Sequence, residues 1–423
     1  MSMLRRRLIM INRQATPDYA NDTYEVLQYK SHLRNEFLIP LKATGDGSGV
    51  ATIRLQSLET QSVKITGNGK FYTDSAGTTE ILGAESTIGT SLGSLYVKVP
   101  AGESCYLVCG KADKLSGLGD ASTNVIADGA NIPFIHYCAI NYPLINLSVI
   151  RFRLVLNSSF TGSINNTHNL TYLDFSNNSL SSFTGSIDNT PNLTYLIFYN
   201  NLLSAFTGSI DNTPKLITLS FTNNLLSSFT GSIDSTPELS HLAFDNNLLS
   251  SFTGSIDNTP NLTYIAFNNN LLSAFTGSID NTPKLTYIAF DNNLLSSFTG
   301  SIDNTPNLMI LSFYNNLLSA LTGDIGKIVK CNFFRSHINT NCTFTYVTRR
   351  NNWTSSYNIL WVSCTSMTST MVDNLLVDLD ASGVMPTGAR LINLSGLCGA
   401  VTSASETART SLVNKGFTVF VNT

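Results

Sequence analysis

The chain has 423 residues, of which 42% are hydrophobic and 13% are charged, and its formal net charge is −3. The length fits two or three ordinary domains or one elongated array with caps, and the hydrophobic fraction is enough for a folded core. The near-neutral charge excludes the basic surface that nucleic-acid binding needs. No stretch approaches the roughly 20 apolar residues that cross a bilayer, so we expect no membrane insertion.

Residues 1–21 contain a basic cluster followed by a short apolar run, Leu8 to Ile11. The run is too short for the apolar segment of a secretion signal. We therefore expect an attachment peptide at 1–21. A protein of this kind that acts outside a cell is expected to leave by lysis or by a dedicated route.

Residues 22–112 contain short runs that alternate apolar and polar residues, such as Val50-Ala-Thr-Ile-Arg-Leu55 and Leu95-Tyr-Val-Lys-Val99. Glycine-rich turns separate the runs. Six or more such strands predict a small β-sandwich. We assign residues 113–146, which follow it, to a linker or an N-terminal cap of the next domain.

A repeat of 23 residues occupies residues 147–345. Its nine-residue core, FTGSIDNTP at Phe183–Pro191, recurs unchanged or with one substitution at Phe206, Phe229, Phe252, Phe275 and Phe298. A fixed period in this range is the signature of a solenoid, in which each unit buries its apolar face only against its neighbours.

Each unit also has the spacing Leu-x-x-Leu-x-Phe-x-x-Asn-x-Leu, as at Leu193, Leu196, Phe198, Asn201 and Leu203. Seven units match this spacing in register, which resembles the leucine-rich-repeat family with Phe in the third apolar position. In a short strand, the second and third apolar residues point the same way into the core. The asparagine is expected to satisfy backbone groups at the turn and to stack into a ladder. The resemblance implies parallel strands along the inner curve of the solenoid.

The nonapeptide is expected to form the return segment of each unit. Phe183 and Ile187 point inward, Gly185 permits a tight bend, and Asp188–Pro191 form a turn. Because the segment lacks helical periodicity, we expect turns or short 3₁₀ pieces and no α-helix.

The ends of the array depart from the repeat. Leu147, Ile150 and Phe152 form a degenerate first unit in which Val155 replaces the asparagine. At the other end Cys331 and Phe334 occupy apolar positions, and we expect the stacking to finish near Asn339.

Residues 346–423 predict an α/β cap in the order helix, strand, helix, strand. The elements are expected at 369–383, 391–394, 403–415 and 417–421. This segment resembles the C-terminal unit of phage and Bacteroidetes leucine-rich-repeat proteins. The resemblance is carried by Val372-Asp-Asn-Leu-Leu, Leu394-Ser-Gly and Gly416-Phe-Thr-Val-Phe-Val-Asn422. The predicted fold is thus mainly β, with a β-sandwich, a solenoid of short parallel strands and an α/β cap.

The sequence lacks the groupings that enzymes need. Five histidines are scattered, and seven cysteines show no paired spacing, so we expect buried free thiols, no metal site and no cofactor. Asp378 and Asp380 are interpreted as a solvated helix cap, with a cation site as the alternative. Asp245 and Asp291 lie two repeats apart, about 10 Å, which is far for a hydrolytic pair. We predict no enzymatic activity.

The repeats differ mainly on the exposed side of the strand. Two positions after the first Leu stand Tyr172, Tyr195, Thr218, His241, Tyr264, Tyr287 and Ile310. Six positions after it stand Ser176, Tyr199, Thr222, Asp245, Asn268, Asp291 and Tyr314. We predict a ligand-binding face made of Tyr172, Tyr195, Tyr199, His241, Asp245, Tyr264, Tyr287, Asp291 and Tyr314.

Aromatic rings beside polar side chains suit sugar rings and protein surfaces equally. The alternative is that these rings only support one another across neighbouring strands. The neutral surface, the missing secretion signal and the phage-like C-terminal unit favour a virion component, a tail fibre or receptor-binding protein. Its partners would be other virion proteins through the N-terminal region, a host-surface glycan or protein, and further copies of itself in a homo-oligomer. A bacterial surface or secreted adhesin and a structural virion spacer are the alternatives.

Overall fold

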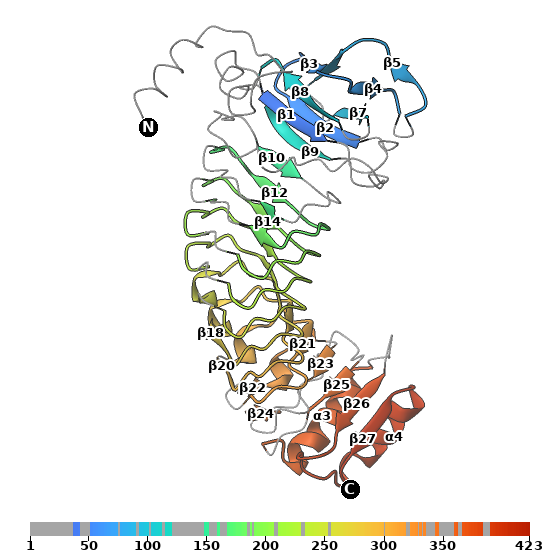
Figure 1. Ribbon diagram of the computed structural model, residues 1–423. Helices are drawn as coiled ribbons and strands as arrows, with labels where there is room; N and C mark the ends of the chain where they lie inside the picture. The colour runs from blue at the N-terminus through green and yellow to red at the C-terminus, as the bar shows by residue number, and fades with distance from the viewer. Residues whose placement is uncertain are drawn as a thin grey trace. The chain divides into compact units, whose positions relative to one another are not determined.

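The computed structural model describes residues 37–120, 148–151, 159–346 and 359–423, with short gaps inside these ranges. The predicted attachment peptide at 1–21 lies outside the described residues. The chain divides into two compact units, Met1–Leu203 and Ser204–Thr423, and each is described by itself (Figure 1). Within the described ranges, no helix combines the length and the apolar character that a bilayer crossing requires.

The N-terminal part of the first unit consists of antiparallel sheets, as the alternating runs predicted. One sheet has the order β1-β8-β3-β6, and in a second set of pairings β2 contacts β7 and β9 while β4 contacts β5 and β7. The strands are β1 (Phe37–Lys42), β2 (Ala51–Ser57), β3 (Gln61–Ile65), β4 (Lys70–Tyr72), β5 (Glu80–Ile81), β6 (Glu85–Ile88), β7 (Gly93–Lys98), β8 (Ser104–Cys109) and β9 (Leu115–Asp120). Val63 and Ile65 of β3 are buried on one face. That the sheets form a β-sandwich stays a prediction.

Strand β9 lies in the segment that we assigned to a linker or N-terminal cap. It pairs antiparallel with β2 and parallel with β10 (Val149–Arg151). Leu118 of β9 faces Ile150 of β10 in this pairing. Through β9, the antiparallel sheet continues into the first parallel strand of the repeats.

The repeat strands of the first unit pair in parallel and in register. Strand β10 pairs with β12 (Tyr172–Asp174), which pairs with β14 (Tyr195–Ile197). Ile150 is buried as the degenerate first unit predicted, while Leu147, Phe152 and Val155 lie outside the described residues. On the return side, β11 (Ser159–Phe160) pairs with β13 (Ser182–Phe183).

The second unit contains a longer parallel sheet whose strands follow chain order. Each residue of a repeat strand faces the residue 23 positions further along, as Leu242 faces Ile265. The repeat strands are β15 (Thr218–Ser220), β16 (His241–Ala243), β17 (Tyr264–Ala266), β19 (Tyr287–Ala289), β21 (Ile310–Ser312) and β23 (Phe333–Arg335). The sheet then continues through β25 (Ile359–Trp361), β26 (Leu391–Leu394) and β27 (Thr418–Val421).

The expectation that stacking finishes near Asn339 was therefore wrong. The repeat spacing is lost there, but β23 pairs in parallel with β25 of the cap. The physical reason is that backbone pairing needs only an open strand edge, and the cap supplies further strands that no longer obey the 23-residue period.

Two columns of phenylalanine rings form the core of the second unit. In the strand-side column, rings such as Phe244 and Phe267 stack at centroid separations of 5.2–5.4 Å. In the return-side column, which the first residue of each nonapeptide forms, the separations are 5.5–5.8 Å. Rings of the two columns meet edge to face, as Phe229 and Phe244 do at 5.0 Å. Because the repeats are more widely spaced on the return side, the strand side is the inner side of the curve in this unit.

The return segments form turns or short 3₁₀ helices, as predicted. In the second unit the segments that begin at Phe206 and Phe229 form turns, in which Thr213 and Thr236 donate to the carbonyls of Ile210 and Ile233. The later segments contain η3 (Ile256–Asn258), η4 (Ile279–Asn281), η5 (Ile302–Asn304) and η6 (Ile325–Lys327), alongside β18 (Ala274–Ser278), β20 (Ser297–Thr299), β22 (Thr322–Asp324) and β24 (Thr343–Thr345). The Ser255 hydroxyl accepts from the Asp257 backbone N–H, and Asp257 Oδ1 accepts from the Ser278 N–H of the following repeat at 2.8 Å. The nonapeptide thus caps its own turn and binds the next one.

Asparagines form two ladders at the end of each strand. The second of the paired asparagines is buried, as the sequence predicted: Asn270 Nδ2 donates to the carbonyls of Phe244 and Phe267, and its Oδ1 accepts from the Leu249 N–H. The first is exposed and left-handed, and Asn269 (φ +56°) donates to Asn246 Oδ1 at 2.7 Å. Asparagine tolerates this conformation better than most residues.

The cap has the predicted order of helix, strand, helix and strand, with α3 at Ser369–Ala381 and α4 at Glu406–Asn414. Asp373 of α3 accepts hydrogen bonds from Thr402 and Ser405, which lie just before α4. Asn422 accepts from the Gly396 N–H and donates to the Gly396 and Cys398 carbonyls. Asp373 and Asn422, both in the stretches that carry the resemblance of this segment, therefore have structural roles, because they join elements that are distant in the chain.

Candidate functional site

The strand side of the second unit presents a column of stacked rings. In β17, Tyr264 and Ala266 lie on the outer face and Ile265 is buried on the opposite, core face. The His241 and Tyr264 rings have centroids 4.2 Å apart at 15°, and Tyr264 and Tyr287 follow at 4.3 Å and 16°. All three side chains are half-buried. The short parallel register of β16, β17 and β19 fixes this stack.

A second column runs beside the rings and consists of acidic and amide side chains. Asp245 Oδ1 accepts from the Asn268 backbone N–H at 2.9 Å and from its Nδ2 at 2.8 Å. Asn268 Oδ1 in turn accepts from the Asp291 N–H, and Asp291 Oδ1 accepts from the Tyr314 N–H, both at 2.8 Å. Each side chain therefore binds the backbone of the next strand in the sheet. Asn268 lies between Asp245 and Asp291 in this chain of hydrogen bonds, so the two carboxylates do not form a pair.

Small buried residues separate the two columns. Ala243, Ala266 and Ala289 are at most 5% exposed although they lie on the outer face of the strands. Burial, the neighbouring Tyr287 hydroxyl and the charge of Asp245 raise the pKa of Tyr264 above its usual value. Ionisation of Tyr264 is therefore disfavoured, and its hydroxyl stays protonated at neutral pH.

Burial also raises the pKa of Asp245, and this effect exceeds the opposing hydrogen bonds from Asn268. Desolvation lowers the pKa of His241, which favours its neutral form at pH 7. The face is therefore polar with little exposed charge, and it suits a ligand that is recognised by shape and hydrogen bonding.

The first unit has its own aromatic group on the strand side. The Tyr172 and Tyr195 ring centroids are 5.2 Å apart at 38°, and the Arg151 guanidinium carbon lies 4.5 Å from the Tyr172 centroid. Tyr199 Oη accepts a hydrogen bond from Asn177 at 3.3 Å. Of the nine predicted residues, Tyr195 has an exposed fraction of 37% and the others are half-buried.

Sequence reasoning missed three contributors to these faces. Arg151 comes from the degenerate first unit and faces Asp174 in the strand register. Asp174 itself is fully buried and accepts from the Ser176 N–H and hydroxyl. The alanines of the second unit were also missed, although a small residue stands four positions after the first Leu in every repeat from Ser220 to Ser312.

Other places that the sequence singled out have structural roles. Asp378 is buried and accepts from the Tyr346 hydroxyl at 2.6 Å, and Asp380 accepts from Lys415, so the interpretation as a solvated cap does not hold. Cys109, Cys331 and Cys398 are buried free thiols, as predicted. Within the described ranges, no group of three or more His, Cys, Asp or Glu is placed to hold a metal ion.

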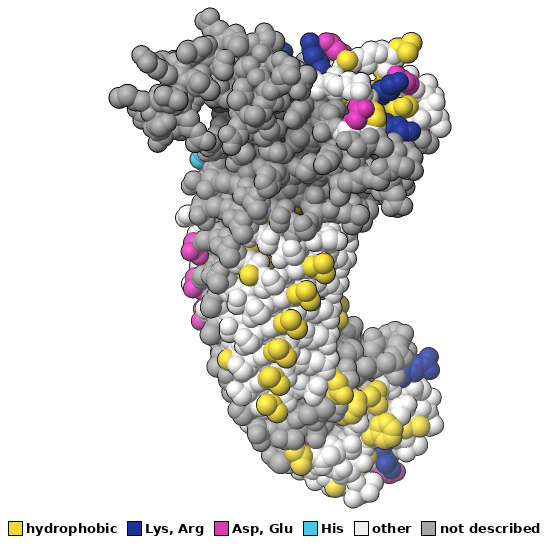
Figure 2. All heavy atoms as spheres, viewed as in Figure 1, with side chains coloured by type: hydrophobic (Ala, Val, Ile, Leu, Met, Phe, Trp, Pro, Cys, Tyr) yellow, Lys and Arg dark blue, Asp and Glu magenta, His cyan; other side chains and the backbone are white. Residues whose placement is uncertain are grey.

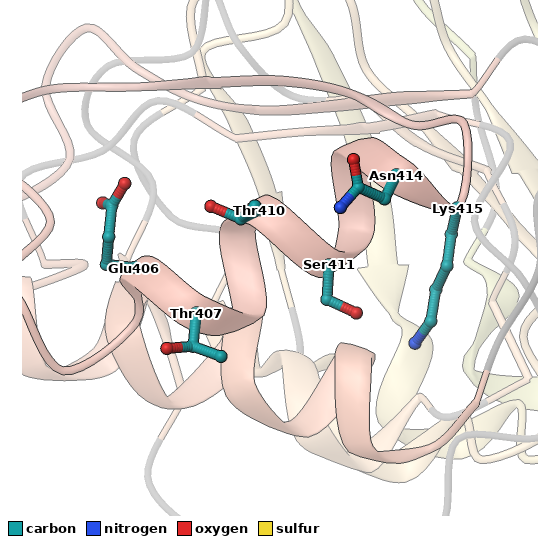
Figure 3. A pocket seen from close by; sticks show the side chains of 6 residues that line it. All are labelled: Glu406, Thr407, Thr410, Ser411, Asn414 and Lys415. Atoms are coloured by element: carbon teal, nitrogen blue, oxygen red, sulfur yellow. The ribbon is translucent and has the colours of Figure 1, made fainter.

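A shallow depression lies beside α4, away from the strand faces. Figure 3 shows that its lining comes from α4 and the residue after it: Glu406, Thr407, Thr410, Ser411, Asn414 and Lys415. Lys415 Nζ is bound to the carbonyl and carboxylate oxygens of Asp380. These side chains project from one helix and include no nucleophile placed beside a base, so the depression is a poor candidate for a reaction site.

A short parallel strand, an asparagine turn and a return segment of turns or a 3₁₀ helix, repeated every 23 residues, define a solenoid of the leucine-rich-repeat type. Solved structures with a similar fold include a leucine-rich-repeat protein of Leptospira interrogans, with 14% identity, a TM-score of 0.37 and coverage of 65% of this chain and 72% of that chain. YopM from Yersinia enterocolitica has 18% identity, a TM-score of 0.37 and coverage of 63% and 50%. InlJ from Listeria monocytogenes has 13% identity, a TM-score of 0.27 and coverage of 65% and 73%.

No protein-family model matches the chain. No curated protein sequence matches it either.

Proposed function

We propose that this chain is a non-enzymatic recognition protein whose strand face in the second unit binds a protein on the surface of a host cell. The observation that supports it most strongly is the ordered face of stacked rings, buried alanines and hydrogen-bonded acidic and amide side chains. Such a face is held in place before any ligand arrives, so little side-chain freedom is lost on binding.

The geometry of the stack favours a protein ligand over a glycan. A sugar ring stacks on an open aromatic face, but both faces of Tyr264 are occupied by His241 and Tyr287 at 4.2–4.3 Å. The ring edges and hydroxyl groups are left to make contacts, and these suit the mixed polar and apolar surface of a protein.

The setting that we propose is a phage particle. In this proposal the N-terminal region, including the predicted β-sandwich, attaches to other virion proteins, and the protein is a tail fibre or receptor-binding protein. Support comes from the neutral Asn, Ser and Thr-rich composition and from the similarity of residues 372–422 to phage leucine-rich-repeat proteins. A bacterial surface or secreted adhesin and a structural spacer remain the alternatives.

The proposal is tested with labelled full-length chain on a panel of Bacteroidetes cells. The double variant Tyr264→Ser with Tyr287→Ser is compared with Phe420→Ser, which removes an aromatic ring that is 52% exposed on β27 and lies outside the stack. We expect the double variant to bind at least tenfold more weakly and the control to bind normally. Circular dichroism establishes that both variants are folded.

Treatment of the cells separates the ligand classes. Binding that is lost after protease treatment supports a protein ligand, whereas binding that survives protease and is lost after periodate oxidation identifies a glycan. A folded chain that binds no cell in the panel, or a double variant that binds unchanged, contradicts recognition through this face.

A further inference from the structure

Every repeat of the second unit exposes a leucine that its core does not use. The asparagine pair is followed by two leucines, and the second is buried while the first is 47–64% exposed. We call these first leucines the leucine stripe, and its members in this unit are Leu225, Leu248, Leu271, Leu294 and Leu317. Figure 2 shows exposed hydrophobic side chains in a regular row along the repeats.

The backbone holds the stripe in place. The Leu271 N–H donates to the Leu249 carbonyl of the preceding repeat at 2.9 Å, and Leu294 and Leu317 make the same bond at 2.9 Å. The buried leucine that follows each stripe residue is held in turn, since the Leu272 N–H donates to Asn293 Oδ1. The hydrogen-bond ladder therefore fixes the spacing of the backbone positions from which the exposed leucines project.

The residues that flank each stripe leucine in the chain are uncharged. Two positions before it stands the exposed asparagine of the ladder in which Asn246, Asn269 and Asn292 bond to one another. Two positions after it stands an exposed serine, such as Ser250 or Ser273. An apolar row that recurs in every repeat is more than scattered surface leucines, which would need no explanation.

We propose that the leucine stripe is a lateral self-association surface that binds the same stripe of a second copy of this chain. A second copy carries the same 23-residue period, so its leucines match the spacing at every repeat. Two neutral strips bring no like charges together. A twofold interface uses the same surface patch on both subunits, and the leucine stripe of each copy would be that patch.

Other occupants fit the strip less well. In an extended peptide, side chains on one face are about 6.8 Å apart, whereas neighbouring strands of the solenoid are about 4.8 Å apart. The side chains of such a peptide therefore cannot match successive leucines. An amphipathic helix, with a pitch of about 5.4 Å, comes closer in spacing. Its apolar stripe is bordered by charged residues, however, and these find no partner along the asparagine and serine rows.

The strip is narrow compared with a standard interface of roughly 800 Å² per partner. We therefore expect weak association in dilute solution that becomes strong where several copies are held side by side. This inference does not depend on what the ring face binds.

Cysteine cross-linking tests the proposal because it detects weak encounters. Leu271→Cys in the full-length chain is compared with Val413→Cys, a control of similar exposure (51%) on α4, and with the unsubstituted chain as baseline. Under mild oxidation we expect disulfide-linked dimers to form at least tenfold faster from Leu271→Cys than from Val413→Cys. Equal rates, or no dimer above baseline, overturn the proposal.

Sedimentation velocity of the triple variant with Leu248→Gln, Leu271→Gln and Leu294→Gln provides a second measurement. We expect the wild-type chain to self-associate as its concentration is raised through the micromolar range, and the variant to stay monomeric at the same concentrations. Self-association that the triple variant retains overturns the proposal. Stripe-dependent binding to phosphatidylcholine vesicles or to an amphipathic helical peptide, with a monomeric wild-type chain, overturns it as well. Normal cell binding by the triple variant would show that the ring face and the stripe act separately.

Discussion

The contacts of the buried asparagine ladder predict how much one asparagine contributes to the free energy of unfolding. In Asn270→Ala, the Leu249 N–H loses its acceptor and stays buried. The Phe244 and Phe267 carbonyls each lose one donor but keep another, from Asn247 and Asn293. A buried N–H without a partner costs about 1–3 kcal/mol, and each lost hydrogen bond costs about 0.5–1.5 kcal/mol. We expect a loss of about 2–6 kcal/mol in the free energy of unfolding.

Asn269→Gly is the matched control, because it removes the neighbouring side chain of the exposed ladder. Glycine adopts the left-handed backbone of this position freely, and the lost bonds are replaced by water. We expect a loss of at most about 1 kcal/mol.

Urea unfolding followed by circular dichroism measures both variants. Because repeat arrays can lose stability locally, hydrogen exchange at the Leu249 amide provides a second reading. Protection at Leu249 should fall in Asn270→Ala and persist in Asn269→Gly. If Asn270→Ala is no less stable than Asn269→Gly, the ladder does not support the turns as we describe.

Three further predictions concern acidity, packing and reactivity. Burial opposes ionisation of Asp373, but hydrogen bonds led by Ser405 outweigh it and hold the pKa of Asp373 below its usual value. The ionised Asp373 therefore stabilises the fold above about pH 4, and this stabilisation is lost as the pH falls through the lower folded-state pKa. The free energy of unfolding should accordingly fall on acid titration of the wild-type chain by an amount that is missing in Asp373→Asn. Gly399→Ala should lower the melting temperature by several degrees because a Cβ would collide with the backbone at the start of α3, whereas Gly89→Ala, which meets nothing, should leave it unchanged. Burial raises the pKa of Cys109 to about 12, so this thiol should resist a maleimide at pH 8 until the chain is unfolded in urea, as mass spectrometry of labelled peptides can establish.

The repeat made most of the second unit predictable. A 23-residue period places residue and partner opposite each other in a parallel sheet, and the burial of Phe, Leu and Asn follows from their fixed spacing. The 3₁₀ return was predictable as well, since Asp257 and its equivalents have the chemistry of turns. Turn chemistry is a local feature and the 23-residue spacing is a periodic one, and a single sequence is enough to recognise either.

What the period does not encode was harder to predict. The sheet continues into the cap because β23 offers an open edge, and an edge leaves no sequence signal. The leucine stripe was hidden for a different reason. The repeat spacing assigns the second of the two leucines, Leu272, to the core, but it does not say that the first, Leu271, forms a continuous exposed row with its equivalents in the other repeats. The rings of the candidate site were found from their variation between repeats, but their mutual stacking depends on the parallel register of β16, β17 and β19.

The central claim, that the ring face of the second unit is the recognition surface, is tested most directly by site-specific photo-crosslinking. A benzophenone amino acid replaces Tyr287 in one full-length variant and Phe420 in another, and each is illuminated on a Bacteroidetes strain that the wild-type chain binds. The account predicts a protease-sensitive cross-linked species from position 287 and none from position 420. Cross-linking that is equal at the two positions, or that occurs only from position 420, would contradict it.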